Sequence, residues 1–93
     1  MPKLSDEQIS TALGKLPGWS RAGDSLVKEY KFDSFRDAIG FINKVADIAD
    51  AADHHPELTN VYNKVRVAYW THTEGGITEN DVAAAGQVEN AAR

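Results

Sequence analysis

Apolar residues near the start of the chain recur at helical spacing. From Ile9 to Leu16 they stand three or four residues apart, which places them on one face of a helix. Ser5 and Gln8 have the spacing of a capping box, in which each side chain bonds the backbone N–H of the other residue. The sequence therefore predicts a helix that begins after Ser5 and is stopped by Pro17.

The next stretch has the pattern of two short strands joined by a turn. The strands are expected at residues 18–21 and 25–32. Between them, Gly23 and Asp24 favour a tight turn over residues 22–24. This pattern predicts a first β-hairpin.

The longest apolar stripe follows that hairpin. Ser34 and Asp37 repeat the capping-box pattern, so a helix is expected to open at residue 33 or 34 and to run to residue 51 or 52. Its apolar residues form one broad face that should pack against a sheet: Phe35, Ala38, Ile39, Phe41, Ile42, Val45, Ala46 and Ile48.

A second hairpin is predicted over residues 58–71, which are rich in valine, threonine and tyrosine. Asn63 and Lys64 stand where a hairpin turn would fit between its two strands. Side chains alternate along the returning strand, so one face carries Val65, Val67 and Tyr69 and the other carries Arg66, Ala68 and Trp70.

A third helix start follows a loop at residues 73–76. Thr78 and Asp81 have capping-box spacing, and Ile77 and Val82 have the spacing of a hydrophobic staple. The closing helix is rich in alanine and has only a weak apolar stripe.

The order helix, hairpin, helix, hairpin, helix predicts an α+β fold. In this two-layer sandwich both hairpins join one four-stranded antiparallel sheet, and three helices cover a single face. The other face and the sheet edges stay partly open, which favours a ligand or a second subunit, and dimerisation is expected. We expect residues 1–93 to form one domain, without repeats or linkers.

Composition narrows the possible functions. Hydrophobic residues at 42% and charged residues at 26% are ordinary for a soluble globular protein, and no apolar run approaches the length needed to cross a bilayer. A net charge of -4 repels nucleic acid and anionic lipid, so a small molecule or another protein is the expected partner. The absence of cysteine excludes disulfides, thiolate metal sites and a cysteine nucleophile. The first residues lack the apolar core of a signal peptide, which favours a cytoplasmic protein.

All three histidines fall in the second half of the predicted fold, at His54, His55 and His72. Histidine exchanges protons near neutral pH without further tuning. Pro56 pushes His55 into extended backbone, where adjacent side chains point opposite ways. A sharp corner between the helix and the strand would instead let both border one cavity, with His72 arriving from the end of the returning strand.

Other roles for these residues remain open at this point. Residues 53–56 could form a solvated helix exit, in which imidazolium complements the dipole of the helix C-terminus. Three imidazoles could also bind zinc, although the histidines lack the i, i+4 helical spacing of many zinc sites. Asp81 is expected to act mainly as a capping carboxylate. Trp70 and Tyr62 could be plain sheet residues or dimer contacts, or an aromatic ring beside a histidine cavity could stack on a flat heterocycle.

One combination of motifs is more specific than any of its parts. Asp-Ala-Ala-Asp-His-His-Pro at residues 50–56, followed by Tyr62, His72 and Asp81, resembles the signature of the pterin-4a-carbinolamine dehydratases. The resemblance extends over nearly the whole chain, through the segments at residues 16–19, 32–35 and 60–65. It implies a four-stranded antiparallel sheet backed by three helices, in agreement with the order predicted above.

The resemblance implies a lyase that removes water from 4a-hydroxytetrahydropterin to give quinonoid dihydropterin, in tetrahydropterin recycling beside aromatic amino acid hydroxylases. The elimination needs a proton delivered to the leaving hydroxyl group and a proton withdrawn from the adjacent nitrogen, which two imidazoles can do. No cofactor, metal or covalent intermediate is implied.

The resemblance also implies roles for individual residues. His54 and His72 are the expected proton-transfer pair, and the resemblance does not decide which of them is the acid. His55 would hold the pterin and could share the acid role, and Asp53 would accept a hydrogen bond from the substrate or orient a histidine. The segment Trp70, Thr71, His72, Thr73 would border the pterin, with Asp81 in a supporting role.

Two positions depart from the family pattern and bear on substrate preference. Many members carry an acidic residue where Thr73 stands, and Trp70 is bulkier than the usual small residue, so a different pterin or heterocycle is one alternative. The other alternative is a protein-binding module, because an animal member also serves as dimerisation cofactor of a transcription factor. A homodimer or homotetramer is expected, since the family forms both.

Overall fold

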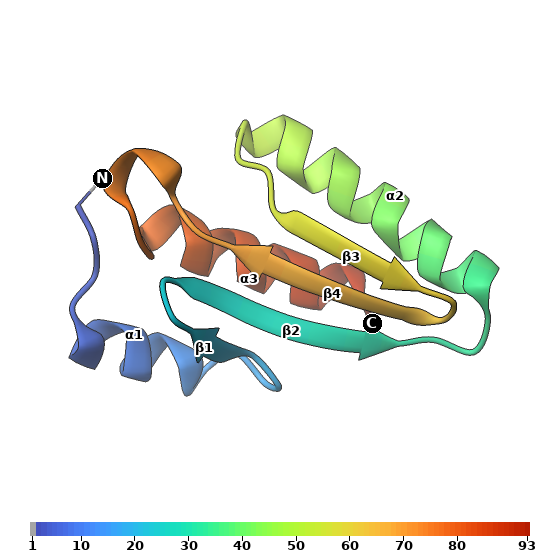
Figure 1. Cartoon of the computed structure of the whole chain (residues 1–93), viewed down its shortest axis with the longest axis horizontal. Coiled ribbons are helices and arrows are strands. Elements are labelled where there is room, and N and C mark those ends of the chain that lie inside the picture. The colour runs from blue at the N-terminus through green and yellow to red at the C-terminus, as the bar shows by residue number, and fades with distance from the viewer. Residues whose placement is uncertain (1) are drawn as a thin grey trace.

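The predicted order of elements is confirmed in the computed structural model, which describes residues 2–93 (Figure 1). A short 3₁₀ helix between β4 and the last helix was not predicted. The elements in chain order are α1 (Asp6–Leu13), β1 (Ser20–Ala22), β2 (Ser25–Lys31), α2 (Phe35–Ala52), β3 (Glu57–Val61), β4 (Lys64–Tyr69), η1 (His72–Glu74) and α3 (Glu79–Ala91).

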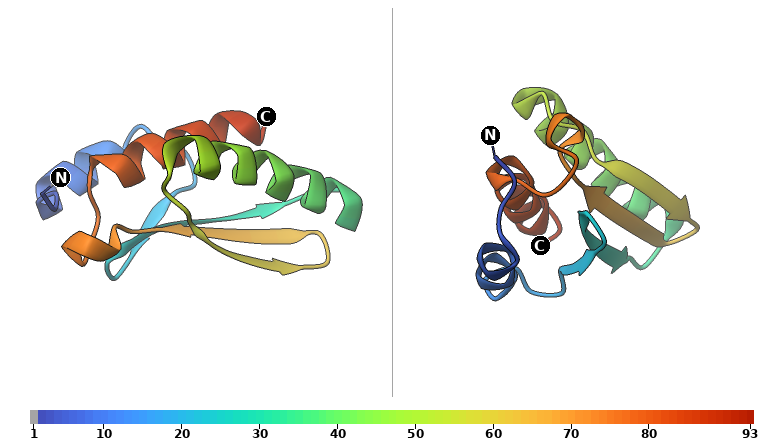
Figure 2. Two further views of the ribbon diagram at one scale, coloured as in Figure 1. Left: turned by 90° about the horizontal axis from the view of Figure 1, so that it is seen from above. Right: turned by 60° about the vertical axis from the view of Figure 1, so that its left-hand side comes forward.

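The strands form one four-stranded sheet in the order β1-β2-β4-β3, and every neighbouring pair is antiparallel. The two hairpins are joined through β2 and β4, where Tyr30 pairs with Val65 and Leu26 with Tyr69. The three helices lie on one side of this sheet (Figure 2). The predicted α+β fold, with helices on a single face, is therefore confirmed.

The predicted N-caps position all three helices. Ser5 and Gln8 form the reciprocal capping box of α1, and Thr78 and Asp81 form that of α3. At α2 the Ser34 hydroxyl accepts the backbone N–H of Asp37 at 3.0 Å. These local hydrogen bonds satisfy donors that every helix N-terminus leaves free, which explains why the sequence locates the helix starts well.

The prediction that the first helix continues to Pro17 is wrong. Helix α1 ends at Leu13, and the backbone N–H groups of Lys15 and Leu16 bond carbonyls three residues back, in tighter turns. Leu16 nevertheless stays buried. The helical spacing of apolar residues therefore extends past the end of the helix, because these turns also place Leu16 on the side of the core.

The predicted turn of the second hairpin is displaced by one residue. Tyr62 and Asn63 form the turn, and Lys64 is already the first residue of β4. The Asn63 side chain donates to the Phe32 carbonyl at 2.8 Å, and the Phe32 N–H donates to the Asn63 carbonyl at 2.8 Å. This contact with a distant segment fixes the turn, and Tyr62 adopts a left-handed conformation with φ of 51° to complete it.

The core lies between the helices and one face of the sheet. The predicted alternation in β4 is borne out on the helix side, where Val65, Val67 and Tyr69 are fully buried. On the opposite face Ala68 is also buried, whereas Arg66 and Trp70 are only partly so. No helix among residues 2–93 is both long and apolar enough to cross a membrane.

A polar cluster ties α3 to the sheet at the end of the core away from the histidines. One carboxylate oxygen of Glu89 accepts hydrogen bonds from Trp19 Nε1 at 3.2 Å, from Lys28 Nζ at 2.7 Å and from the Tyr30 hydroxyl at 2.6 Å. The side chains of Lys28 and Glu89 are only 17% and 15% exposed. Burial alone would raise the pKa of Glu89, but the hydrogen bonds from Lys28 and Tyr30 and the Lys28 charge outweigh burial and lower the pKa.

This cluster predicts a pH-dependent stability. The folded-state pKa of Glu89 is below its ordinary value of 4.5, so the carboxylate stabilises the fold above that pH, and this contribution is lost as the pH falls through the folded-state pKa. We expect Glu89→Gln to lower the free energy of unfolding at neutral pH by about 1–3 kcal/mol, because charge-assisted bonds are lost. The deficit relative to wild type should shrink in acid.

Urea unfolding followed by far-ultraviolet circular dichroism at several pH values measures this difference. Glu7→Gln, an exposed change in the first turn of α1, is the matched control and should stay within about 0.5 kcal/mol of wild type. An equal deficit at neutral and acidic pH would contradict the assignment of this pH dependence to Glu89.

Candidate functional site

The three histidines border one cavity of about 430 Å³. It lies where the end of α2, the end of β4 and the start of α3 come together. A larger hollow of about 790 Å³ lies between α1 and the start of α3, but no histidine lines it. The residues that line the histidine cavity are Asp53, His54, His55, Thr71, His72, Thr73 and Asn80.

The end of α2 turns His54 toward this cavity. Asp53 caps the helix in a left-handed conformation with φ of 50°, and its N–H group bonds carbonyls of the last turn. The N–H of His54 then donates to the Ala49 carbonyl at 3.1 Å. This pattern of bonds reverses the chain sharply. Of the two arrangements that the sequence allowed, the structure has the sharp corner between helix and strand. Both adjacent histidines, His54 and His55, therefore border one cavity.

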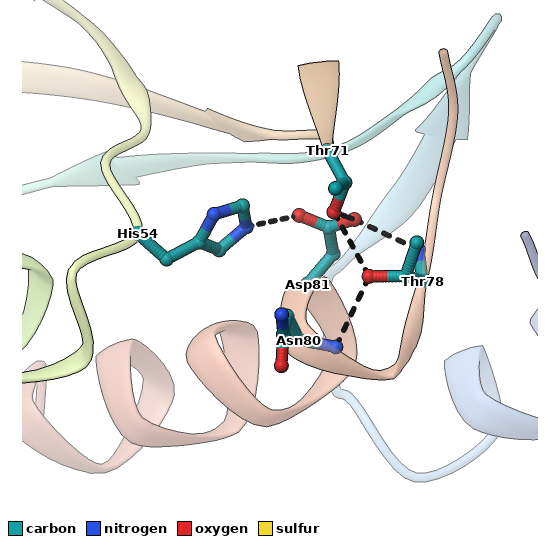
Figure 3. Close-up of polar contacts among 5 residues, drawn as sticks. All are labelled: His54, Thr71, Thr78, Asn80 and Asp81. Atoms are coloured by element: carbon teal, nitrogen blue, oxygen red, sulfur yellow. Dashed lines mark hydrogen bonds and ion pairs between the residues drawn. The ribbon is translucent and has the colours of Figure 1, made fainter. Parts of the chain in front are cut away.

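The buried Asp81 carboxylate is the centre of the site's hydrogen bonds (Figure 3). Its Oδ1 atom accepts from His54 Nε2 at 2.5 Å. Its Oδ2 atom accepts from the Thr71 hydroxyl at 2.9 Å and from the Thr78 N–H at 2.8 Å. Asp81 thus joins the α2–β3 connection, the end of β4 and the start of α3.

Thr78 extends this network on the α3 side. Its hydroxyl lies 2.8 Å from the Thr71 hydroxyl and accepts the Asn80 N–H at 3.2 Å. Because the Thr71 proton is already committed to Asp81, the Thr78 hydroxyl donates to Thr71. The hydroxyl groups of Thr71 and Thr78 are therefore both oriented by hydrogen bonds within this network.

The Asp81 contact fixes the tautomer of the neutral His54 ring. A carboxylate only accepts, so Nε2 carries the proton and Nδ1 of the neutral ring has a free lone pair. In the part of the chain that the structure describes, no protein group is hydrogen-bonded to Nδ1. His54 can accept a proton at Nδ1 while the resulting positive charge lies beside Asp81.

The other two histidines are more exposed. His55 Nε2 lies 2.9 Å from Asp50 Oδ1, and both side chains are largely solvent-accessible, at 58% and 78%. His72 is the first residue of η1, and its ring centroid lies 4.7 Å from that of Trp70. The cavity therefore combines one tightly held imidazole with two that solvent reaches.

Most of the predicted site residues come together. Asp53, Thr71 and Thr73 line the cavity together with the histidines. Trp70 does not line the cavity, but its ring lies against that of His72, which does. The carboxylates that bond the two corner histidines are Asp81 for His54 and Asp50 for His55, and neither is Asp53. Asn80 also lines the cavity and was not predicted, since a helix N-terminal asparagine gives no distinctive sequence signal.

Among residues 2–93, no three His, Asp or Glu side chains are grouped so that they could hold a metal ion, so the zinc alternative has no ligand set there.

Tyr69 is fully buried beside His54, and its hydroxyl has no hydrogen-bond partner within residues 2–93. Burial, with the nearby Asp81 charge, raises the pKa of Tyr69 to about 12.

Comparison with known proteins identifies relatives over the whole fold. The family model described as pterin 4 alpha carbinolamine dehydratase matches residues 2–91. A relative from Thermomicrobium roseum, which carries the family's name, is 48% identical over 85 residues, covering 91% of each chain. One of the same name from Mycobacteroides abscessus is 43% identical over 89 residues, covering 96% of this chain and 95% of the relative.

A solved structure agrees with this match. The crystal structure of a Brucella melitensis protein, described as a transcriptional coactivator/pterin dehydratase, superposes with a TM-score of 0.94 at 35% identity, covering 98% of this chain and 99% of that one. The chain belongs to the pterin-4-alpha-carbinolamine dehydratase family. The resemblance predicted from the sequence is confirmed, together with the enzyme class of the family, a hydro-lyase.

We expect Asp81→Ala to lower the free energy of unfolding by about 2–4 kcal/mol, because it removes a helix cap and takes the acceptor from the buried Thr78 N–H and the partly buried Thr71 hydroxyl. Denaturant titration measures the loss. Asn80→Ala is the neighbouring control, since Asn80 is exposed and enters the network only through its backbone, and should stay within about 0.5 kcal/mol of wild type. A similar loss in both variants would argue against the network as its cause.

Proposed function

We propose that this protein dehydrates 4a-hydroxytetrahydropterin to quinonoid dihydropterin by histidine general acid–base catalysis. The observation that carries this proposal is the convergence of His54, His55 and His72 on one cavity, with His54 held by a buried carboxylate. Family membership supports the same substrate class. We further propose that the reaction serves tetrahydropterin recycling in the cytoplasm.

The proposed reaction is an elimination across the C4a–N5 bond of the pterin. One group donates a proton to the 4a-hydroxyl, which leaves as water, and another removes the proton from N5 as the C4a=N5 double bond forms. Atoms and charge balance with two proton-transfer groups and no further reactant. Two such groups that border one cavity fulfil this requirement.

In this proposal His54 is the base and Nδ1 is its reacting atom. Asp81 keeps the proton of the neutral ring on Nε2, so the free lone pair on Nδ1 is available for the proton from N5. The imidazolium that forms is stabilised by the adjacent Asp81 carboxylate. This arrangement follows the logic of a base oriented by a third group.

His72 is then the acid that protonates the leaving hydroxyl group. It comes from η1 and so from a different element than His54, which lets the two groups address different atoms of one ring. His55 and Asp53 are proposed to bind the pterin, with Thr71 and Thr73 at its border. His55 Nε2 is already engaged with Asp50 Oδ1, which suits a role in binding better than proton transfer at that atom.

We expect the double variant His54→Ala, His72→Ala to lose about 10²–10⁴-fold in the enzymatic rate, the usual contribution of general acid–base catalysis. Stopped-flow ultraviolet absorbance of freshly generated 4a-hydroxytetrahydropterin, with and without protein, measures the acceleration. Thr59→Ala, an exposed change on the helix-free sheet face, is the control and should retain the wild-type rate. A folded double variant with full activity would falsify the assigned roles.

A second proposal concerns association with another protein chain. The outer edge of β3 has no neighbouring strand among the described residues, and Val61 and Tyr62 at its end are 68% and 65% exposed. Exposed strand edges favour pairing with a further strand. We propose that this edge forms a homodimer, from which a homotetramer could be built, and the coactivator description of the Brucella relative makes binding to another protein the alternative function.

The dimer proposal predicts a mass of twice the monomer by light scattering of the purified protein. Val61→Lys should shift the population toward monomer, because edge lysines oppose strand pairing. Lys64→Arg, which keeps the charge on the neighbouring strand, is the matched control and should remain dimeric. A monomeric wild type at concentrations used for the activity assay would contradict the proposal.

A further inference from the structure

Two consecutive aromatic residues at the end of β4 each contact a different histidine of the cavity. The Tyr69 ring centroid lies 5.3 Å from that of His54, with an angle of 31° between the ring planes. The Trp70 centroid lies 4.7 Å from that of His72, with an angle of 53°. Because successive strand residues point to opposite faces, one dipeptide reaches the histidines from two sides.

The Tyr69 contact completes the restraints on His54. Asp81 bonds the ring at Nε2, while the tyrosine ring packs near its face. The Tyr69 side chain is fully buried, so it does not move aside into solvent. Its hydroxyl makes no hydrogen bond within residues 2–93 and stays protonated at neutral pH, so the ring is the part of Tyr69 that acts on His54.

The Trp70 contact has a different setting. His72 is exposed at the start of η1 and has no hydrogen-bonded side-chain partner in the described part of the chain. The partly buried indole of Trp70 is therefore the main restraint on the orientation of its imidazole. His55 provides a comparison, since it bonds Asp50 and packs against no aromatic ring among residues 2–93.

We propose that Tyr69 and Trp70 are positioning residues that orient His54 and His72, respectively, for proton transfer. The expected effect on kcat rests on the proposed function, whereas the orientation of the two histidine rings does not. Aromatic pairs of this kind favour one arrangement by roughly two- to tenfold. Loss of either ring is expected to lower kcat by about that factor and to leave KM nearly unchanged, because neither ring lines the cavity.

Histidine side-chain NMR tests the structural part. In Tyr69→Leu, the ring-proton resonances of His54 should lose their aromatic ring-current shift, while those of His72 and His55 stay in place. In Trp70→Leu, only the His72 resonances should move. His55 is the internal control in both spectra, and single His→Gln variants assign the three sets of resonances.

Stopped-flow kinetics of the same variants, together with Tyr69→Phe and Trp70→Phe, tests the consequence for catalysis. The phenylalanine variants keep a ring at each position, so they should restore both the histidine shifts and most of kcat. Tyr69→Phe should also be at least as stable as wild type, because it removes a buried hydroxyl without a partner. This rescue separates positioning by a ring from a loss of stability.

Histidine resonances that do not move in the leucine variants, or a kcat that stays at the wild-type value in both, would overturn the proposal. If Tyr69→Leu does not fold, Trp70→Leu at the partly exposed position decides by the same criteria. A wild-type protein that fails to accelerate dehydration, yet shows the selective NMR shifts, would overturn the proposed function and leave the ring–histidine contacts established.

Discussion

The Asp81 carboxylate is the interaction on which both the end of the fold and the cavity depend. It lies in the first turn of α3, is completely buried, and accepts hydrogen bonds from three different segments. A buried carboxylate is costly unless hydrogen bonds compensate for its lost hydration, and here the donors come from Thr71, Thr78 and His54. The same group therefore starts a helix, closes the end of a central strand and sets the proton position on the His54 ring.

The sequence was informative wherever a few neighbouring residues decide the structure. Capping pairs such as Ser5 with Gln8 located helix starts, and the alternation in β4 identified its buried face, because both patterns are local. It was less informative where a distant contact decides. The turn at Tyr62 and Asn63 is displaced by one residue because Asn63 bonds Phe32, about thirty positions earlier in the chain.

The same distinction applies to the candidate site. Two histidines are adjacent in sequence, and the expected end of the returning strand placed His72 with them, so their grouping was visible. The family resemblance added a supporting role in the site for Asp81, which the pattern alone identified as a capping carboxylate. The hydrogen bond between His54 and Asp81 was not foreseen, because it joins residues 27 positions apart and depends on the left-handed corner at Asp53. Contacts of Tyr69 and Trp70 with histidines likewise require the three-dimensional arrangement, since their alternation in the strand is equally compatible with ordinary core packing.

The residues around the cavity differ in how much the fold depends on them, and this difference determines which of them can change in evolution. Asp81 serves stability and the site together, so almost any substitution there is opposed by selection on both. Thr73 and Asn80 border the same cavity, yet they are exposed and their side chains make no hydrogen bond within residues 2–93. These rim positions can vary without disturbing folding, so the shape of the cavity can change there while the His54–Asp81 pair is inherited unchanged.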